Sequence, residues 1–484
     1  MRNFHFLVLL FLTIALSNCT KNERATLPLN VEINDFVWKG MNTYYLWQEE
    51  IPVLDDELFS SEEELFSFLE EFDQPDVLFE SLLYQPETVD KWSWIVDDYI
   101  ELEAYFSGIR KTSGAKIKLY LTAENSTQVF GVVRYIVPNT DAATKPIARG
   151  DVFNSVNGTI LNTSNYNDLI NTSDTYTLNL GTYTYNPISE TVEIIPTGES
   201  VTLINSEYPE NPVHQQTTFD IDGRKIGYVM YNSFTSNYNQ ELNNTFQNLK
   251  NENVTDLILD LRYNGGGSVQ TASYLASMIT GQFEGNILTQ EKWNAKWQNW
   301  LEENHPDWLT NYFTNTMSDG TPINNLNLSQ VVILTTSSSA AASELVINAL
   351  KPFIDVVTIG TTTHGKYVAS ITLYDSDNFS RVDANTNHLW AMQPIVLKEV
   401  NSIGAYEPDG FAPSILSQED FSNMGVLGTE TERLTARAIQ YITTGNKSSS
   451  AEYIYFLDSN KQLRSPNRLE TEMYIEKTHP FERI

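Results

Sequence analysis

The sequence predicts a multidomain α/β protein, an α+β arrangement in which separate domains follow one another along the chain. With 484 residues, the chain has room for about three domains of ordinary size. The spacing of apolar residues changes twice, from a helical period to a period of two and then to strands that alternate with helices. We therefore expect a helical domain over residues 34–105, a β-rich module over 106–200, an α/β core over 219–441 and a C-terminal extension over 442–484.

The first predicted domain is helical because its apolar residues recur every three or four positions. The run 60–64 reads SSEEE, which is typical of a helix start with capping serines followed by acidic residues. The apolar positions that set the period are Phe36, Val37, Met41, Tyr44, Tyr45, Leu65, Phe66, Phe68 and Leu69.

The second predicted domain alternates apolar and polar residues, for example at 116–121 and 175–180. In its middle, residues 146–158 read PIARGDVFNSVNG, which resembles the strand and turn of PDZ domains. The alternative is any small β-module with an Asn-Gly hairpin turn. PDZ domains bind peptides by strand addition beside a loop whose amides hold a terminal carboxylate. The resemblance implies that the exit of this loop, and the peptide-binding residues, are Phe130, Gly131 and Val132.

The third predicted domain alternates buried strands with helices. The strands that we expect are 225–231, 257–261 and 331–334, and the helices are 239–250, 268–279 and 343–350. This order predicts an α/β core.

The first 18 residues have the pattern of a secretory signal peptide, with Arg2 before an apolar stretch over residues 6–16. Residues 16–19 read LSNC, which resembles a bacterial lipobox whose cysteine receives a diacylglyceryl group. An ordinary signal peptide with an incidental cysteine is the alternative. We expect lipidation of Cys19 and a tether over residues 19–33. The lipid would anchor the chain in the cell envelope, in the outer rather than the inner membrane, with the body in the periplasm or at the cell surface.

The composition excludes several classes of function. The chain has 30 Lys and Arg residues against 62 Asp and Glu, a net charge of −32, and no basic block that could contact phosphates. A nucleic-acid partner is therefore not expected. The aromatic content of 12% is that of a folded chain. The six histidines include no pair at a metal-ligand spacing, so we predict no metal site and no cofactor.

Two segments of the core carry candidate chemistry. Residues 260–267 read DLRYNGGG, a strand end followed by glycines whose amides can approach an anion, although a tight turn is the alternative. Residues 334–346 read LTTSSSAAASELV, a strand-to-helix junction of small residues. Lys366 ends the next predicted strand, and a lysine buried beside a hydroxyl loses its charge and can act as a general base. His364 is a candidate for polarising the site, with a packing role as the alternative.

The order of these segments from Asn34 to about Pro413 resembles that of the tail-specific, or C-terminal processing, serine peptidases. The resemblance implies a PDZ-like domain beside a crotonase-related α/β peptidase core, with unfolded or C-terminal peptide segments of envelope proteins as substrates. It implies a Ser-Lys dyad with Lys366 as base and Glu344 as the acid of the junction motif. It assigns Asp260 and Arg262 to a pair that braces the glycine loop. The amides that it assigns to the oxyanion site are those of Gly265, Gly266 and Ala342.

The nucleophile position departs from this family pattern. It lies three residues before Glu344 and 25 before Lys366, and both counts give Ala341, which has no hydroxyl. The chain is then a natural pseudopeptidase or an inactivated variant, or Ser339 or Ser343 has taken the role. Each of these serines lies two residues away, a shift that turns a side chain through about 200° on a helix.

Three functions remain open. The first is a lipid-anchored serine peptidase of the cell envelope that captures and cleaves unstructured peptide tails. The second is a catalytically inactive pseudopeptidase that binds peptides, because Ala341 occupies the nucleophile position. The third is an envelope glycan-binding lipoprotein. It depends on an aromatic platform of Trp293, Trp297 and Trp300 on one helical face, for which a packing stripe is the alternative.

Overall fold

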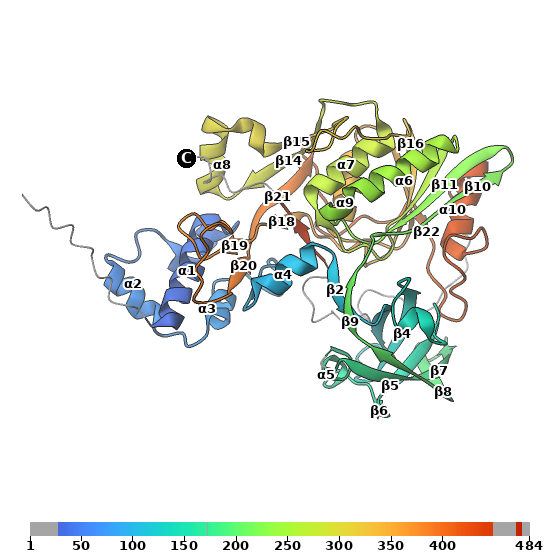
Figure 1. Cartoon of the computed structure of the whole chain (residues 1–484), viewed down its shortest axis with the longest axis horizontal. Coiled ribbons are helices and arrows are strands. Elements are labelled where there is room, and N and C mark those ends of the chain that lie inside the picture. The colour runs from blue at the N-terminus through green and yellow to red at the C-terminus, as the bar shows by residue number, and fades with distance from the viewer. Residues whose placement is uncertain (1–27, 172, 449–470, 477–484) are drawn as a thin grey trace, which may run out of the picture.

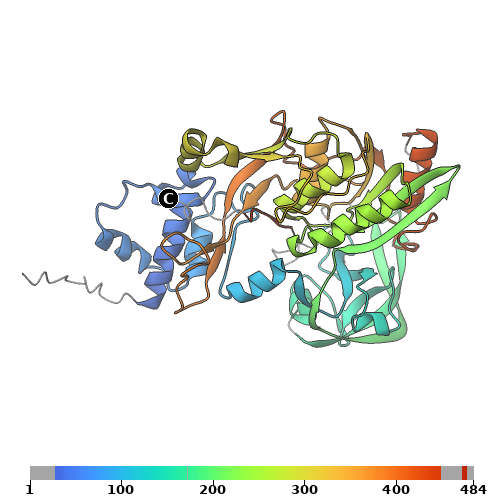
Figure 2. The ribbon, with the colours of Figure 1, turned by 45° about the horizontal axis from the view of Figure 1, so that its top comes forward.

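The computed structural model describes residues 28–171, 173–448 and 471–476. Figure 1 shows a helical region at one end, a core of sheets and helices, and a β-module. Strands β2 (Ile109–Thr112) and β9 (Ser206–Pro209) pair with each other and connect the β-module to the rest of the chain. Figure 2 shows the same three regions from a second direction. The fold is multidomain α/β, as predicted.

The N-terminal region consists mainly of helices. Ser61 accepts a hydrogen bond from the amide of Glu64 at 3.3 Å, so the predicted helix start caps the second helix. The first helix begins at Leu29, so the last five residues of the predicted tether are helical. That boundary was wrong because Val31 and Ile33 bury apolar side chains in the core. The elements of this region are α1 (Leu29–Tyr44), α2 (Glu62–Leu69), α3 (Pro75–Ser81), β1 (Trp94–Val96) and α4 (Tyr99–Phe106).

The β-module is a sheet with the strand order β3-β4-β5-β7-β8, and β6 pairs with β5. Asn157 and Gly158 have φ values of 51° and 78° in the turn between β5 and β6, as an Asn-Gly hairpin requires. The elements are β3 (Ala115–Leu121), β4 (Val129–Ile136), β5 (Val152–Val156), β6 (Thr159–Ile160), α5 (Tyr166–Asn171), β7 (Thr175–Asn186) and β8 (Thr191–Ile204).

The core contains a six-stranded sheet with the order β10-β11-β12-β16-β17-β22. The first two strands pair antiparallel and all the later pairs are parallel. Parallel strands need crossover connections, which the helices between them supply. The strands are β10 (Val213–Ile221), β11 (Arg224–Tyr231), β12 (Asp256–Asp260), β16 (Gln330–Thr335), β17 (Asp355–Gly360) and β22 (Ile415–Leu416). The helices are α6 (Asn239–Asn251), α7 (Val269–Thr280), α9 (Ala342–Leu350) and α10 (Arg433–Thr444).

Helices cover both faces of this sheet, which explains why its strands are apolar throughout. Leu257 and Leu259 of β12 belong to a buried cluster with residues of α6, α7 and α9. Ile258, which points the other way, clusters with Leu434 and Ala438 of α10. Burial of each such side chain stabilises the fold by about 1.5–3 kcal/mol.

A second core sheet has the order β13-β23-β18-β21-β14-β15. Trp293 ends β14, whereas Trp297 and Trp300 lie in the following helix, so the predicted aromatic stripe on one helical face was wrong. Trp297 is buried and stacks on Tyr44 with ring centroids 5.4 Å apart. The elements are β13 (Gly267–Ser268), β14 (Ile287–Trp293), α8 (Ala295–Asn304), β15 (Thr310–Tyr312), β18 (Val368–Ser370), β21 (Ile395–Asn401) and β23 (Met473–Tyr474). A three-stranded sheet of β1, β20 (Ala391–Gln393) and β19 (Leu373–Tyr374) joins the N-terminal region to the core.

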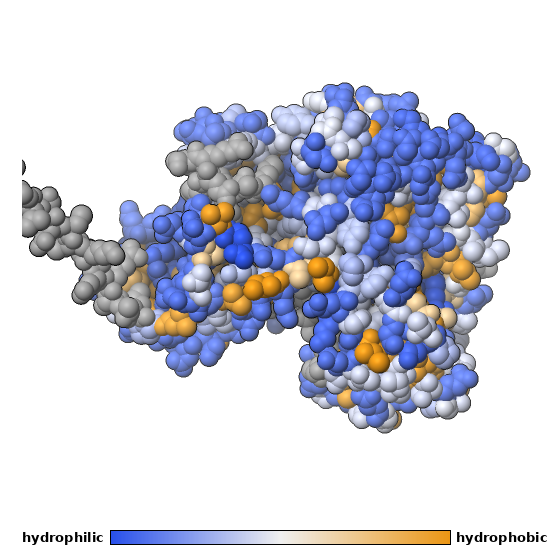
Figure 3. Space-filling view, viewed as in Figure 1, coloured by the Kyte–Doolittle hydropathy of each residue, from blue (hydrophilic) through white to orange (hydrophobic). Residues whose placement is uncertain are grey.

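The surface in Figure 3 is mostly hydrophilic over the core, with apolar side chains in separate patches. This distribution agrees with the acidic composition. Within residues 28–171, 173–448 and 471–476, no helix combines the length and apolar content needed to cross a membrane. Cys19 and the predicted signal peptide lie outside the described residues.

Candidate active site

The candidate chemistry gathers where three neighbouring strands of the core sheet end. Strands β12, β16 and β17 are parallel, so the segments that follow them meet at one edge of the sheet. These segments are the glycine loop 261–267, the junction 336–341 and the segment 361–366. The amide of His364 donates to the carbonyl of Ser339 at 3.0 Å, which joins the second and third segments.

Ala341 lies at the strained point of this junction. It directly precedes α9 with φ 56° and ψ −112°, values that cost a residue with a Cβ about 1–3 kcal/mol. Its side chain is fully buried. A Cβ on Gly266 would lie 2.7 Å from the Cβ of Ala341 and 2.9 Å from the amide nitrogen of Ala342, so only glycine fits opposite. The sequence-predicted nucleophile position and glycine loop are therefore in contact.

Glu344 fixes the backbone around Ala341 and Lys366. One carboxylate oxygen accepts hydrogen bonds from the amides of both residues at 2.9 Å. The other accepts from the Thr363 hydroxyl at 2.6 Å and the Gly365 amide at 2.7 Å. Burial raises the pKa of Glu344 to about 7, and the four hydrogen bonds oppose that rise. Glu344 thus holds the backbone of Ala341 and that of Lys366, the two predicted dyad residues, in a fixed arrangement.

Lys366 has the burial expected of a general-base lysine, with 1% of its surface exposed. Burial lowers its pKa, and the neighbouring carboxylate of Glu472 opposes this effect. The Nζ atom donates to the carbonyl oxygen of Thr471 at 2.7 Å and lies 3.5 Å from the Glu472 carboxylate. Its partners therefore come from residues 471–472, near the end of the chain.

Glu472 lies in the candidate site and was not predicted from the sequence. Its carboxylate also accepts a hydrogen bond from the Trp94 indole at 3.2 Å. Burial raises the pKa of Glu472 to about 7, although Lys366 acts in the opposite direction. Residues 471–476 read TEMYIE, in which polar and apolar residues do not alternate, so no strand pattern within the predicted C-terminal extension pointed to Glu472.

The two serines beside Ala341 have structural hydrogen bonds instead of facing Lys366. The Ser339 hydroxyl donates to the carbonyl of Leu261 at 2.8 Å. The Ser343 hydroxyl donates to the carbonyl of Asn264 at 2.9 Å. Both side chains are fully buried and hold the junction against the glycine loop.

In the glycine loop, the amide that holds a peptide carbonyl is that of Gly267. It donates to the carbonyl oxygen of Glu472 at 2.5 Å. The Gly266 amide instead donates to the Asn264 side chain at 2.8 Å, so its predicted oxyanion role was wrong. Gly265 lies within this loop and lines the cleft, and Ala342 is the first residue of α9.

Asp260 and Arg262 form the predicted brace. Both are fully buried, and their side chains approach to 2.8 Å. Arg262 also contacts Glu432 at 2.7 Å and Glu419 at 3.2 Å. Arg149 of the β-module joins the network through Glu419 at 2.7 Å. Burial alone would raise the pKa of Glu432, but the guanidinium of Arg262 holds it at about 2.

The predicted peptide-binding residues of the β-module do not form a binding edge, and this prediction was wrong. Phe130, Gly131 and Val132 lie inside β4, which pairs with β3 on one side and β5 on the other. A Cβ on Gly131 would lie 2.2 Å from the ring of Phe153. Phe130 and Val132 are fully buried. Strand addition needs an unpaired edge, which these residues lack.

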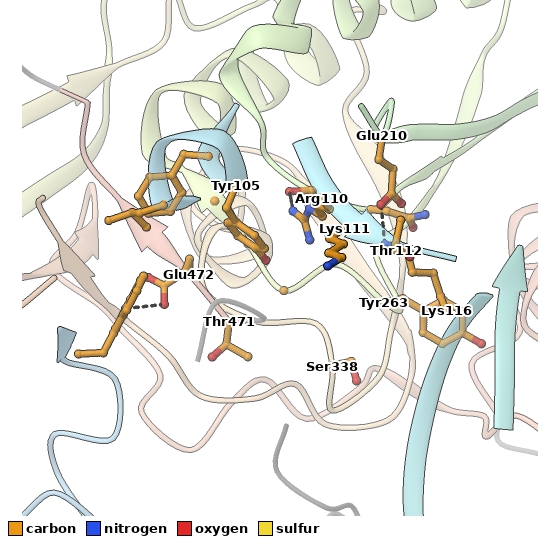
Figure 4. A pocket seen from close by; sticks show the side chains of 18 of the residues that line it. Tyr105, Arg110, Lys111, Thr112, Lys116, Glu210, Tyr263, Ser338, Thr471 and Glu472 are labelled. Carbon is orange, nitrogen blue, oxygen red and sulfur yellow. Dashed lines mark hydrogen bonds and ion pairs between the residues drawn. The ribbon is translucent and has the colours of Figure 1, made fainter. Parts of the chain in front are cut away.

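A cleft of about 1780 Å³ opens between the helical region, the β-module and the core. Figure 4 shows Glu210 and Lys116 on one side of it and Thr471 and Glu472 on the other. Ser338 and His364 also line the cleft. Burial lowers the pKa of His364 to about 4 and the nearby Lys366 adds to this, so the imidazole is neutral near pH 7. The cleft has the size and the mixed lining that a peptide requires.

Comparison with known proteins agrees with this arrangement. Residues 225–387 match the model of peptidase family S41, and residues 32–94 match the peptidase S41 N-terminal domain. A carboxyl-terminal-processing protease of Picosynechococcus sp. (strain ATCC 27264 / PCC 7002 / PR-6) is 25% identical over 159 residues. That match covers 32% of this chain and about a third, 32%, of the relative.

A crystal structure of a Bacteroides fragilis NCTC 9343 protein assigned to the S41 proteases has the same fold. The TM-score is 0.62 at 24% identity, and the alignment covers 85% of this chain and 97% of that chain. The two matched segments include most of the helical region, the glycine loop, the junction and Lys366. The chain belongs to peptidase family S41 and is related to the C-terminal processing proteases.

Proposed function

We propose that this chain binds extended peptides in the S41 cleft and does not cleave them. The observation that carries the proposal is Ala341, which occupies the strained position before α9 between Gly266, Glu344 and the segment that leads to Lys366. This position holds the side chain that would attack a peptide carbonyl. A methyl group there cannot form an acyl-enzyme.

Peptide binding is supported by the groups that remain in the cleft. Lys366 and the Gly267 amide already hold two consecutive peptide carbonyls, those of Thr471 and Glu472. A cleft of about 1780 Å³ has room for further residues of a bound peptide. Peptide is also the substrate class of the family.

Replacement of the nucleophile by a neighbouring serine is not favoured by the local geometry. Ser339 and Ser343 donate their hydroxyl hydrogens to the main chain of the glycine loop, and both are fully buried. Use of either as a nucleophile would break a buried hydrogen bond and rearrange the loop.

The test compares cleavage and binding in the same preparations. Fluorescein-labelled casein is incubated with the unaltered chain, with Ala341→Ser and with Ala341→Ser/Lys366→Ala. We expect binding by the unaltered chain and by Ala341→Ser, weaker binding by the variant that lacks Lys366, and cleavage by Ala341→Ser alone, because loss of a catalytic-dyad member costs several orders of magnitude in rate. Cleavage by the unaltered chain that disappears in Lys366→Ala would overturn the proposal.

We also propose that the chain is held at the cell envelope by a lipid on Cys19. The proposal is based on the LSNC sequence after an apolar stretch. Expression in bacteria supplied with radiolabelled palmitate should label the unaltered chain and leave Cys19→Ala unlabelled. Equal labelling of both chains would contradict it.

A further inference from the structure

Residues 471–476, which contain the short strand β23, lie directly over the candidate active site. Strand β23 runs parallel to β13 of the glycine loop, with Gly267 opposite Met473. On its other side it pairs with β18, where Ser370 lies opposite Tyr474. The amide of Ile475 donates to the carbonyl of Ser370 at 3.1 Å. The segment therefore joins two strands that do not pair with each other.

The groups that hold this segment are those that would hold a peptide undergoing acyl transfer. Lys366 donates to the carbonyl of Thr471, and the glycine-loop amide of Gly267 donates to the carbonyl of Glu472. A Cβ on Gly266 would lie 2.2 Å from this second carbonyl oxygen and 2.7 Å from the Cβ of Ala341. The peptide bond between residues 472 and 473 thus lies beside the nucleophile position.

Side chains of the segment are recognised as well as its backbone. The Glu472 carboxylate lies between Lys366 at 3.5 Å and the indole of Trp94 at 3.2 Å. The Tyr474 ring packs on Phe106 with centroids 4.4 Å apart. Met473 is almost fully buried. Such a slot favours a carboxylate followed by bulky side chains.

The segment also separates the dyad positions from the cleft. Thr471, Glu472 and Tyr474 line the cleft, and Figure 4 shows the first two at its wall. Behind them, Ala341 and Lys366 are 0% and 1% exposed. A peptide that enters from the cleft must therefore displace these residues to reach Lys366.

We propose that residues 471–476 are an intramolecular peptide ligand, which fills the slot between β13 and β18 until an extended peptide with a glutamate at the Glu472 position displaces it. The inference deepens the proposed peptide-binding function and depends on it. Residues 471–476 are then the occupant of the slot, and the carboxylate of Glu472 is the side-chain group that the slot recognises.

The test uses the full chain and a fluorescent hexapeptide with the sequence TEMYIE. Glu472→Lys places a second cation beside Lys366 and should release the segment. We expect at least tenfold faster hydrogen exchange over residues 471–476 and at least tenfold tighter binding of the hexapeptide than in the unaltered chain. Glu252→Lys, at the exposed end of α6, is the matched control and should change neither quantity. A hexapeptide with Gln in place of its first glutamate, the one that corresponds to Glu472, should bind to Glu472→Lys at least tenfold more weakly than TEMYIE does.

A second measurement covers the case in which Glu472→Lys does not fold. Excess hexapeptide added to the unaltered chain should speed exchange over residues 471–476 by at least tenfold. Unchanged exchange at saturating hexapeptide, or equal affinity for the unaltered chain and Glu472→Lys, would overturn the inference while casein binding still supports the proposed function. Release of the segment without any gain in binding of either probe would overturn both.

Discussion

Two buried clusters of charged residues lie at the ends of the core strands, and they shift the pKa values of their glutamates in opposite directions. In the cluster around Arg262, a single guanidinium contacts Asp260, Glu419 and Glu432, and the pKa of Glu432 falls to about 2. In the cluster around Lys366, the ammonium lies 3.5 Å from Glu472, whose pKa rises to about 7. Both acids are nearly fully buried.

The difference lies in how well each charge is compensated. Arg262 donates several short hydrogen bonds to its carboxylates, so the ionised acids are stabilised more than burial destabilises them. Lys366 donates its short hydrogen bond to a carbonyl and leaves Glu472 at a longer distance. The first cluster therefore holds Arg262, and with it the glycine loop, in one arrangement. The second contains groups that can exchange partners, as a binding site requires.

Removal of Arg262 should break this arrangement and have the largest effect. Arg262→Met removes the nearest cation from the buried carboxylates of Asp260 and Glu432, which costs about 3–5 kcal/mol in the free energy of unfolding. Arg224→Met is the matched control, because its ion pair with Asp256 is half exposed and worth less than about 1 kcal/mol. Urea denaturation followed by tryptophan fluorescence measures both. Similar losses of unfolding free energy in the two variants would show that the buried cluster stabilises the fold no more than the exposed ion pair does.

The contributions of Glu432 and Glu472 to the free energy of unfolding should change with pH in opposite directions. The folded pKa of Glu432 is depressed, so its contribution is present above about pH 4.5 and is lost as the pH falls towards 2, by about 3 kcal/mol. The difference in unfolding free energy between the unaltered chain and Glu432→Gln should shrink over that range. A difference that stays constant down to pH 2 would contradict the pairing with Arg262.

For Glu472 the folded pKa is raised, so its contribution is present below about pH 4.5 and is lost as the pH rises towards 7. The unaltered chain should therefore lose stability relative to Glu472→Gln between pH 5 and 7, by less than about 3 kcal/mol. Denaturation curves in a buffer series of constant ionic strength measure the difference. A gain of stability over this range would show that the Lys366 pair is as well compensated as that of Arg262.

The smallest predicted effect concerns the backbone at Ala341. Glycine tolerates φ 56° and ψ −112°, so Ala341→Gly relieves strain that offsets the lost methyl contacts. Ala349→Gly, in the same helix with ordinary geometry, has no such compensation. The first substitution should be at least about 1 kcal/mol less destabilising than the second. Equal costs in thermal unfolding would show that Ala341 is not strained.

The sequence was sufficient to predict the elements of the core and the local parts of the site. Asp260 with Arg262, and Ala341 with Glu344, are close in sequence, and their spacing determines their contacts on one strand end or one helix start. Lys366 lies one crossover away, and the right-handed order of parallel strands brings it to the same edge of the sheet.

Other parts could not be predicted because they depend on contacts between distant segments. The partners Glu419 and Glu432 lie 157 and 170 residues from Arg262, and no local pattern points to them. Glu472 comes from a six-residue segment whose pairing with β13 and β18 is set by tertiary structure alone. The paired state of β4, which excludes Phe130 to Val132 as a peptide edge, is likewise a property of the whole sheet.

We propose that the Ser-Lys dyad of this chain lacks only the hydroxyl at residue 341, and reaction with a fluorophosphonate tests this proposal. Glu472→Lys is included in every chain so that residues 471–476 do not shield the site. Intact-mass and peptide mass spectrometry should find one adduct, on residue 341, in Ala341→Ser and none in the chain that retains Ala341. Lys366→Ala should abolish the adduct. An adduct on Ser337, Ser338, Ser339 or Ser343 of the chain that retains Ala341 would contradict this proposal, because it would reveal a working nucleophile elsewhere in the junction.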